Sequence, residues 1–415
     1  MSKIEELIER LCPNGVEYKT IGEVATYRRG SFPQPYTNSS FYGGDGAMPF
    51  VQVADIEDNG FKLKEKTKQT ISKIAQPKSI YVPKGTVICS IQGTIGRVAI
   101  TQFDSYIDRT IAIFESFKIE INKRFFAYCI ELKFGIEKQF ARGSTLKTIT
   151  KEEFTKFRIP VPPLEVQCEI VHILDDFTLL SAELSAELKA RQKQYEYYLY
   201  KLISDSKKIT KNKLYELTIW DKKFNAVENY MQPNVKKYPT LLAVDLFNLE
   251  RKNGNVFLLS TGGQRGWTTE EVAGDNISEG EVVTIPWGKS RPVQEVMKYY
   301  CGKFVTGDNR IATSNDIKKL NNKYLFYWMQ TQSERIDKFY RGSGIQHPNM
   351  RNVLTLEIEL PSIDEQKRIV SILDKFEKLC NDISKGLPAE IEARQKQYEY
   401  YRDKLLTFKE LKVNE

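Results

Sequence analysis

The residues from which catalytic chemistry would be expected are two histidines, six cysteines and one Gly-Lys-Ser tripeptide. The cysteines are scattered and form no Cys-x-x-Cys pair, so neither a zinc site nor a disulfide framework is predicted. Gly288-Lys289-Ser290 is not a phosphate-binding loop, because Val283 occupies the position of its first glycine. His172 falls in a helical pattern, where a lone histidine is more often structural than catalytic, and His347 falls in a loop. Zinc-deaminase and adenine-methyltransferase signatures are also missing, so the sequence predicts no catalytic or metal site.

The composition is that of a globular protein with two or three domains. The chain has 415 residues, 41% of them hydrophobic, and a net charge of +8. This mild positive charge permits a nucleic-acid partner without requiring one. No apolar run approaches the roughly 18 residues that span a bilayer, and the N-terminus is charged and amphipathic, unlike a signal peptide. We therefore expect a cytoplasmic protein with no membrane partner.

The nonapeptide ARQKQYEYY occurs twice, at residues 190–198 and 393–401, which is 203 positions apart. Upstream of it, Gln167 and Phe177 correspond to Gln366 and Phe376 at an offset of 199. An internal repeat dictates architecture, so the chain is predicted to consist of two similar halves.

The repeated segments are predicted to be helices. Apolar residues recur at spacings of three and four from Ile170 onward, which predicts one helix over residues 163–203, roughly 60 Å long. A helix of this length needs a partner, and the second copy is the obvious one. The second copy contains Gly386-Leu387-Pro388, which should kink or break it. The first copy carries SAELSAEL at residues 181–188, which is either plain helix-forming sequence or an insert that sets the length.

Residues 14–160 and 207–361 differ in character from the helices. They contain strand signals and helical stretches, which together predict a compact α+β domain in each half. The strand signals are TVICSI, RVAIT, AIFESFKI, VFLLS, EVVTIPW and YCGKFVTG. The helical stretches are KRFFAYCIELKFGIEKQF and NKYLFYWMQTQSERIDKFY.

Two divergent globular regions, each followed by a helix that ends in ARQKQYEYY, resemble the specificity (S) subunit of a type I restriction-modification system. The resemblance also rests on LCPNGVEY, GTIGRVAI, RGSTLKTIT and the pair IPVPPLEVQ and ELPSIDEQ. It implies an α+β fold with two target recognition domains joined by two long antiparallel helices, a coiled-coil-like spacer with pseudo-two-fold internal repeat. The expected segments are recognition domain 1 (1–161), first spacer (162–206), recognition domain 2 (207–361), second spacer (362–409) and a tail (410–415).

The resemblance further implies a non-catalytic, DNA-binding subunit. Each recognition domain would read one half of a split double-stranded DNA target. The helices would recruit two methyltransferase (M) subunits and, in the full complex, restriction (R) subunits. This chain would bind no cofactor itself, and S-adenosylmethionine, ATP and magnesium would be held by the partner subunits.

Within this resemblance, loop residues that hydrogen-bond to bases or phosphates are the candidate DNA contacts. In the first domain they are Arg28, Arg29, Ser31, Gln92, Arg97, Ser144 and Lys147. In the second domain they are Gln264, Arg265, Trp267, Lys289, Arg291, Arg310, Ser343 and Gln346. For each of them a solvated charge or a structural turn is an equally good interpretation.

The tyrosines of the repeated peptide are the candidate partner-binding residues. They are Tyr195, Tyr197, Tyr198, Tyr398, Tyr400 and Tyr401. Helical geometry points them in more directions than one partner helix can cover, and surplus aromatics suit a protein interface. An aromatic seam between the two helices is the competing interpretation.

Three alternatives remain open. A self-contained nuclease or methyltransferase is disfavoured by the missing motifs. A coiled-coil scaffold that binds only protein explains the helices but not two divergent domains with basic loops. A specificity subunit of a type IIB-like system, whose partner both cuts and methylates DNA, fits the sequence as well.

Overall fold

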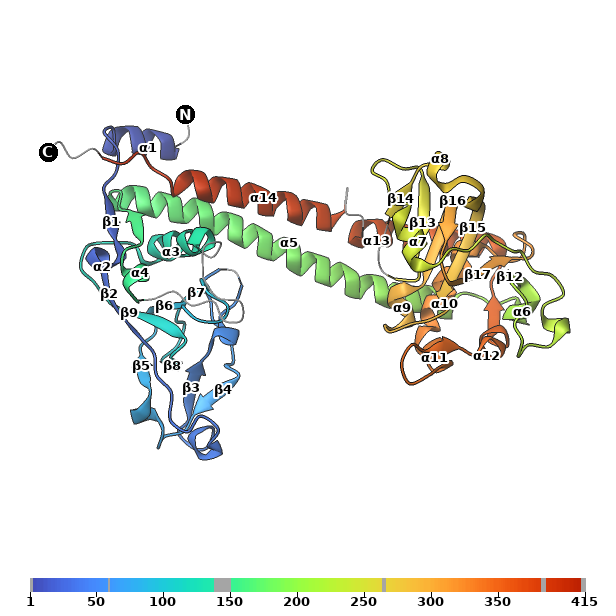
Figure 1. Cartoon of the computed structure of the whole chain (residues 1–415), viewed down its shortest axis with the longest axis horizontal. Helices are drawn as coiled ribbons and strands as arrows, with labels where there is room; N and C mark the ends of the chain where they lie inside the picture. Colours follow the sequence, from blue (N-terminus) through green and yellow to red (C-terminus); the bar gives the residue numbers. More distant parts are fainter. Residues whose placement is uncertain (1–2, 59, 138–150, 263–265, 382–385, 412–415) are drawn as a thin grey trace. The chain divides into compact units, whose positions relative to one another are not determined.

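The computed structural model describes residues 3–58, 60–137, 151–262, 266–381 and 386–411. The chain forms two compact units (Figure 1). Unit 1 contains residues 1–187 and 389–415, and unit 2 contains residues 188–388. Both units contain helices and sheets, which confirms the α+β prediction.

Unit 1 contains two four-stranded sheets and a helical layer. The first sheet has the order β2-β9-β6-β7 and the second the order β4-β3-β8-β5, while β1 pairs with β10. The strands are β1 (Tyr18–Thr20), β2 (Ala25–Arg29), β3 (Met48–Val51), β4 (Gln69–Ile71), β5 (Ile80–Val82), β6 (Val87–Ser90), β7 (Val98–Ile100), β8 (Ser105–Ile107), β9 (Ile111–Phe117) and β10 (Arg158–Pro160). The helices that belong wholly to unit 1 are α1 (Lys3–Leu11), α2 (Ile21–Val24), α3 (Lys123–Glu137) and α4 (Lys151–Thr155).

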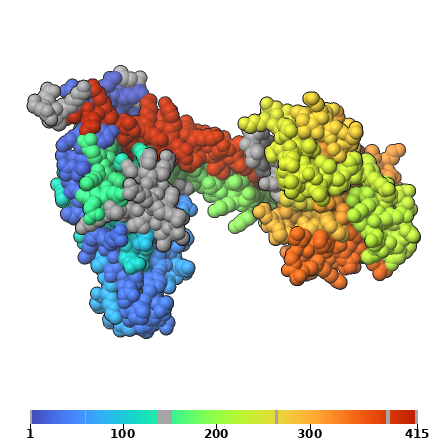
Figure 2. Space-filling view, viewed as in Figure 1, coloured from blue at the N-terminus to red at the C-terminus, as the bar shows by residue number. Residues whose placement is uncertain are grey.

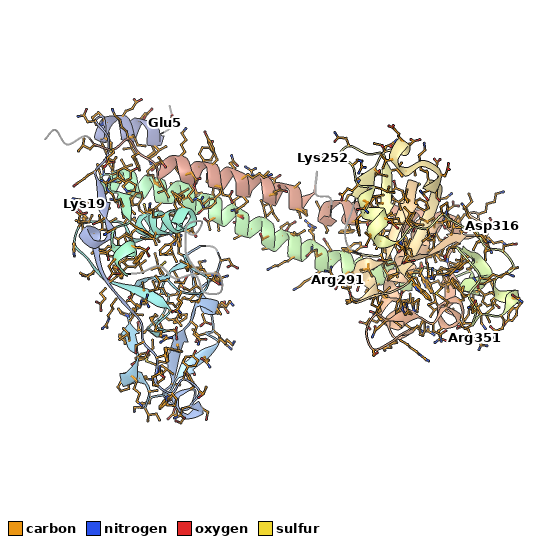
Figure 3. The ribbon with its side chains drawn as sticks, in the orientation of Figure 1. Glu5, Lys19, Lys252, Arg291, Asp316 and Arg351 are labelled. Atoms are coloured by element: carbon orange, nitrogen blue, oxygen red, sulfur yellow. The ribbon has the colours of Figure 1, made fainter. Side chains whose placement is uncertain are left out.

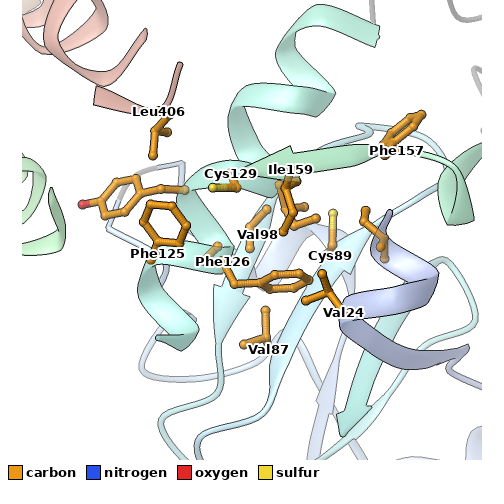
Figure 4. Close-up of a cluster of buried hydrophobic side chains, with 14 of the residues drawn as sticks. Val24, Val87, Cys89, Val98, Phe125, Phe126, Cys129, Phe157, Ile159 and Leu406 are labelled. Carbon is orange, nitrogen blue, oxygen red and sulfur yellow. The ribbon is translucent and has the colours of Figure 1, made fainter. Parts of the chain in front are cut away.

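The main core of unit 1 lies between the first sheet and the helices. Phe125, Phe126 and Cys129 of α3 meet Val87 and Val98 of the sheet in this core (Figure 4). The apolar residues of α3, which are buried throughout 125–130, therefore join the sheet to the long helices, since Ile170 and Leu174 belong to the same cluster.

Unit 2 contains a six-stranded sheet of order β12-β17-β15-β16-β13-β14. The strands of unit 2, inside and outside this sheet, are β11 (Thr210–Lys213), β12 (Thr218–Trp220), β13 (Val256–Leu259), β14 (Gly266–Thr268), β15 (Ser278–Pro286), β16 (Lys298–Thr306), β17 (Asn309–Ser314), β18 (Tyr340–Arg341), β19 (His347–Pro348) and β20 (Glu357–Leu360). Its shorter helices are α6 (Leu214–Leu217), α7 (Ala243–Asn248), α8 (Glu270–Ala273), α9 (Val293–Val296), α10 (Asn322–Thr331), α11 (Ser333–Asp337) and α12 (Met350–Leu354).

Strong bending of β15 and β16 shapes this sheet. Gly280 and Gly302 face each other across the two strands, and both have positive φ angles, 148° and 136°. Glycine adopts such angles without the clash that a Cβ would bring. The far ends of the sheet meet as a result, since Asn309 of β17 donates from its side chain to the Leu259 carbonyl of β13 at 2.7 Å.

The predicted long helix is α5 (Leu164–Asp205), whose residues belong to both units. The second copy is divided into α13 (Ile363–Asn381) and α14 (Leu387–Leu405), and Gly386 is not helical. The predicted break is thus confirmed. The first part of α5 runs antiparallel to α14 in unit 1, and the last part runs antiparallel to α13 in unit 2 (Figure 1).

The internal repeat is visible as matched contacts at the predicted offsets. Phe177 stacks on Tyr401 with ring centroids 5.4 Å apart and an interplanar angle of 22°. In unit 2, Phe376 stacks on Tyr198 at 5.4 Å and 24°. A long-helix phenylalanine from one copy therefore meets a nonapeptide tyrosine from the other copy in both units.

The same correspondence extends to polar contacts at the helix starts. The side-chain oxygen of Gln167 accepts the Asn122 amide proton at 2.8 Å, and Gln366 accepts that of Asn321 at 2.9 Å. Both glutamines are buried, at 1% and 0% exposure. A buried amide must find partners, so these glutamines fix each long helix to the shorter helix of its own unit.

Most of the other predicted elements are confirmed. The six strand signals form β6, β7, β9, β13, β15 and β16. The stretch from Asn322 forms two helices, α10 and α11, with a break at Gln332. Within the described residues, no helix is long and apolar enough to cross a membrane.

Candidate nucleic-acid interface

Five of the predicted contact residues of unit 2 belong to segments that meet near Trp287, which directly follows β15. The N–H of Lys289 donates to the Gln346 carbonyl at 3.0 Å, and the Gln346 N–H donates back to Lys289 at 3.2 Å. This pair of hydrogen bonds joins the WGKSR loop to the RGSGIQ loop, so Arg291 and Ser343 come from adjoining loops. Both of these side chains are exposed, and Arg291 is labelled at the surface of unit 2 in Figure 3.

Arg310 lies beneath this surface and not on it, which differs from its predicted role as a base contact. Its guanidinium carbon lies 4.0 Å from the centroid of the Trp287 ring, and its side chain is 6% exposed. It donates to Asp221 at 3.4 Å, and burial lowers the pKa of Arg310 and raises the pKa of Asp221. Arg310 therefore supports Trp287 from within the fold.

Two further side chains, those of Lys222 and His347, lie close to Trp287. The ammonium group of Lys222 lies 5.5 Å from its ring centroid, and the ring of His347 lies 4.8 Å from it. The Trp287 carbonyl and His347 Nδ1 are 2.9 Å apart. Sequence reasoning missed Trp287 and Lys222, although Trp287 directly precedes the Gly288-Lys289-Ser290 tripeptide. We call Lys222, Trp287, Arg310 and His347 the tryptophan cluster.

Lys289 also differs from the prediction that its side chain reads DNA. Its ammonium group lies 2.6 Å from Asp337 and 4.9 Å from the Tyr340 ring centroid, and the side chain is only 9% exposed. Its charge is therefore neutralised inside unit 2. Gly288 beside it lies close to the RGSGIQ loop, because an added Cβ would lie 2.6 Å from the Ile345 side chain, which would have to shift.

Trp267 lies at a different place in unit 2. It is 43% exposed and packs edge-on against Phe257 at 5.2 Å. It lines a shallow pocket with residues 250–254, which include Arg251 and Lys252. Its neighbours Gln264 and Arg265 lie outside the described residues.

In unit 1 the predicted contacts fall at one edge of the first sheet. Arg29 at the end of β2 pairs with Ala112 at the start of β9, and Ser90 at the end of β6 pairs with Ile111. The turn that carries Gln92 and Arg97 follows Ser90 directly. The topology therefore brings YRRG and IQGTIGR to the same sheet edge.

The arginines at this edge have different environments. Arg28 pairs with Glu115 at 2.7 Å, and Arg97 pairs with Asp58 at 2.5 Å and donates to the Ile56 carbonyl at 3.1 Å. Arg29 is exposed and has no ion pair within the described part of the chain. Ser31 donates to the Lys78 carbonyl at 2.8 Å, which ties its hydroxyl to the segment that precedes β5. Ser144 and Lys147 lie outside the described residues.

The six candidate tyrosines of the helices divide by position in the same way in both copies. Tyr198 and Tyr401 form the aromatic stacks described above. Tyr195 and Tyr398 are partly buried in the seam, where burial raises the pKa of both hydroxyls. Tyr197 and Tyr400 are 57% and 63% exposed.

The aromatic seam therefore occupies four of the six tyrosines. The remaining pair, Tyr197 and Tyr400, is exposed at equivalent positions of the two copies. Among the residues that the structure describes, no group of three or more His, Cys, Asp or Glu side chains is placed to hold a metal ion.

The type I restriction modification DNA specificity domain matches residues 13–194 and 243–393. The chain therefore belongs to the family of type I restriction-modification specificity subunits, which recognise DNA sequences.

Among its relatives is a putative type I restriction enzyme specificity subunit of Haemophilus influenzae. The two are 32% identical over 329 residues, which cover 70% of this chain and 74% of the relative. The EcoR124I/EcoR124II specificity subunit of Escherichia coli is 30% identical over 313 residues, which cover 69% of this chain and 72% of the relative.

Solved structures share the fold at low sequence identity. The S subunit from M. genitalium superposes with a TM-score of 0.57 and 13% identity over 94% of this chain and 96% of that one. A chain from a structure on complex assembly and conformational transition of the type I restriction-modification system superposes with a TM-score of 0.56 and 14% sequence identity. The match covers 95% of this chain and 98% of that chain.

Proposed function

We propose that this chain reads a split DNA target, with unit 1 contacting one half-site and unit 2 the other. The observation that carries the proposal is the set of matched contacts at offsets of 199 and 203, which places the same helical framework under two different sheets. A shared framework with unlike sheets is what two recognition domains for two unlike half-sites require. Base edges specify sequence, and phosphate contacts set position.

Unit 2 would meet DNA through the loops around the tryptophan cluster. Arg291, Ser343 and Gln346 carry the donors and acceptors that base edges recognise. Lys222 and His347 supply positive charge or hydrogen bonds for phosphates, and Arg310 holds the Trp287 ring in place from below.

We further propose that Tyr197 and Tyr400 contact two equivalent methyltransferase subunits. Their support is their equivalent position in the repeat and their exposure in both copies. The chain itself would supply no catalytic group. S-adenosylmethionine would then be held by the methyltransferase subunits, and ATP and magnesium by restriction subunits where these are present.

The test of DNA reading uses cells that express this chain with its methyltransferase subunit. Sequencing that detects N6-methyladenine should find a split motif, methylated on both strands across a fixed gap. Absence of any motif, with both proteins soluble and associated, would contradict the proposal.

Partner binding is tested separately by pull-down of the methyltransferase subunit. The Tyr197→Ala, Tyr400→Ala double variant should bind it more weakly, because interface tyrosines supply buried aromatic area. Tyr230→Ala is the matched control, since this tyrosine of unit 2 is similarly exposed, at 66%, but lies outside the long helices. Undiminished binding by the double variant would refute the role of the exposed pair.

A further inference from the structure

The second sheet of unit 1 presents a row of polar and aromatic side chains that the candidate contacts above do not include. The row runs through Arg109, Phe32, Tyr36, Gln52 and Gln69, and we call it the reading row. Its members come from four separate stretches of sequence, which only the fold brings together. The part of unit 1 that carries it is drawn in blue shades in Figure 2.

Each member of the row touches the next. The guanidinium carbon of Arg109 lies 4.9 Å from the Phe32 ring centroid, and the Phe32 and Tyr36 rings meet edge to face at 5.0 Å. The Gln52 amide donates to the Tyr36 hydroxyl and to the Gln69 side-chain oxygen, the latter at 3.0 Å. Arg109 and Tyr36 are exposed, and the two glutamines are partly exposed.

The backbone around the row is rigidly held. Asp55 is 1% exposed, and its carboxylate accepts the N–H of Gln52 at 2.8 Å and the N–H of Lys68 at 2.7 Å. One buried carboxylate thus fixes the segments of both glutamines, because Gln69 follows Lys68. Such charge-assisted hydrogen bonds to backbone N–H groups are strong and directional.

The other end of the row is held equally closely. β3 and β8 pair in parallel through Val51 and Ile107, so Gln52 and Arg109 leave the same edge of the sheet. Gly30 permits the approach of the segment that carries Phe32, because an added Cβ would overlap the carbonyl oxygens of Ile107 and Asp108. These contacts are more than a solvated loop requires, and they pre-organise the row.

A dense group of lysines belongs to the same part of unit 1. Residues 62–84 contain seven lysines and a single acidic residue, Glu65, and all seven lysines are exposed. The lysines are Lys62, Lys64, Lys66, Lys68, Lys73, Lys78 and Lys84. Gln69 lies within this segment, so positive charge flanks the row directly. Exposed lysines of one sign bind phosphates without sequence preference, while amide and guanidinium groups read bases.

We propose that the reading row, and not the sheet edge at Arg28 and Gln92, reads the half-site of unit 1, while the lysines of residues 62–84 contact its phosphates. The inference rests on the proposed function and names the residues that determine one half of its specificity. Glutamine amides pair with the N6 and N7 atoms of adenine, and arginine pairs with guanine. The half-site of unit 1 should therefore contain adenine contacted by Gln52 or Gln69.

The test compares methylation motifs of the wild-type chain and of the Gln52→Ala, Gln69→Ala double variant, each with its methyltransferase subunit. We expect one half of the motif to become degenerate at one or more positions, with roughly 5- to 150-fold weaker discrimination, while the other half is unchanged. Gln76→Ala is the matched control, because Gln76 lies in the same part of unit 1 but donates to the Gly46 carbonyl. An unchanged motif in the double variant overturns the inference.

A double variant that loses all methylation is decided by DNA binding at low salt. Equal affinity for the target and for DNA scrambled in one half-site, with a preference retained when the other half-site is scrambled, supports the inference, because only the base readers of unit 1 are removed and the phosphate-binding lysines remain. A preference for the target that survives against scrambling of either half-site overturns it. If the wild-type chain itself gives no motif, the proposed function fails and not merely the reading row.

The lysines are tested independently by the salt dependence of DNA binding. Lys66→Gln, Lys68→Gln, Lys73→Gln should flatten the plot of log affinity against log salt by up to about 0.9 for each phosphate that is no longer neutralised. Lys156→Gln, an exposed lysine of unit 1 outside this segment, is the control. An equal change in the control and the triple variant contradicts a specific phosphate-binding role.

Discussion

The helix seams of the two units differ at two neighbouring positions, which allows a test of the interaction between Glu131 and Arg402. In unit 1, Glu131 of α3 is partly buried, and its carboxylate lies 3.5 Å from the Tyr398 hydroxyl. The Arg402 guanidinium carbon lies 5.7 Å from the Tyr398 ring centroid. At the equivalent positions of unit 2, the repeat has Gln330 and Leu199. An acid with a nearby cation in one seam is thus replaced by an amide with an apolar residue in the other.

Replacing Arg402 alone should show how much the partly buried Glu131 carboxylate destabilises unit 1. Burial raises the pKa of Glu131, and the charge of Arg402 partly offsets this. Arg402→Leu leaves the carboxylate without that cation, which should destabilise unit 1 by about 1–3 kcal/mol when Glu131 is ionised. The figure lies below that of a fully buried pair because the Arg402 side chain is 21% exposed.

The sign of the pH dependence follows from the raised pKa. A carboxyl whose pKa is higher in the folded state than in the unfolded state binds more protons when folded. The free energy of unfolding therefore falls as the pH rises and the carboxyl ionises. The destabilisation by Arg402→Leu should therefore be larger at pH 8 than at a pH low enough to protonate Glu131. Calorimetric unfolding of the full chain at both pH values measures the difference.

The double variant Glu131→Gln, Arg402→Leu reproduces the side chains of unit 2 and is the control. We expect it to recover most of the stability that Arg402→Leu loses at pH 8, because the ionised carboxylate of Glu131 is no longer present. Equal destabilisation at both pH values, or no recovery in the double variant, would refute the interaction between Glu131 and Arg402.

Packing and helix geometry give three further predictions. Phe177→Ala and Phe376→Ala should each cost about 1–3 kcal/mol, since each removes one of two matched stacks; calorimetry that finds only one of them destabilising would contradict the equivalence of the seams. Gly30→Ala should destabilise unit 1 by roughly 1–3 kcal/mol, because its Cβ would overlap two carbonyl oxygens, and a normal unfolding temperature would show that the backbone can yield. Deletion of residues 181–184 shortens α5 by about 6 Å, and base pairs are about 3.4 Å apart, so the gap in the methylated motif should shrink by one or two base pairs. An unchanged gap would count against the tandem SAEL as a length-setting insert.

Much of the architecture could be predicted because it depends on local pattern. The helix over residues 163–203 and the break at Gly386 follow from apolar spacing and from glycine and proline, which act through neighbouring residues. The repeat offsets likewise predicted which residues would be equivalent, and the matched stacks of Phe177 and Phe376 follow them. The resemblance carried by these same motifs named the family that the domain match shows.

The candidate interface was predicted only in part, because residue type does not determine burial. The loops that carry Lys289, Arg291 and Gln346 do meet, as their spacing around two strand ends allows. Arg310 and Lys289 nevertheless direct their charges inward to Asp221 and Asp337. No sequence pattern distinguishes these two cations from the exposed Arg291.

The sequence by itself therefore determined the two copies, their helices and the family, since repeats and periodicity are properties of the chain read in order. Only the tertiary structure decided that residues 389–415 join unit 1 and residues 363–381 join unit 2, because each pairs with a part of α5 distant in sequence. It also decided which tyrosine of each triplet remains exposed. Helical phase sets the direction of a side chain, but the residue that fills that direction comes from elsewhere in the fold. The meeting of Gln52, Gln69 and Arg109 has the same origin, since strand pairing and the Asp55 carboxylate bring their segments together.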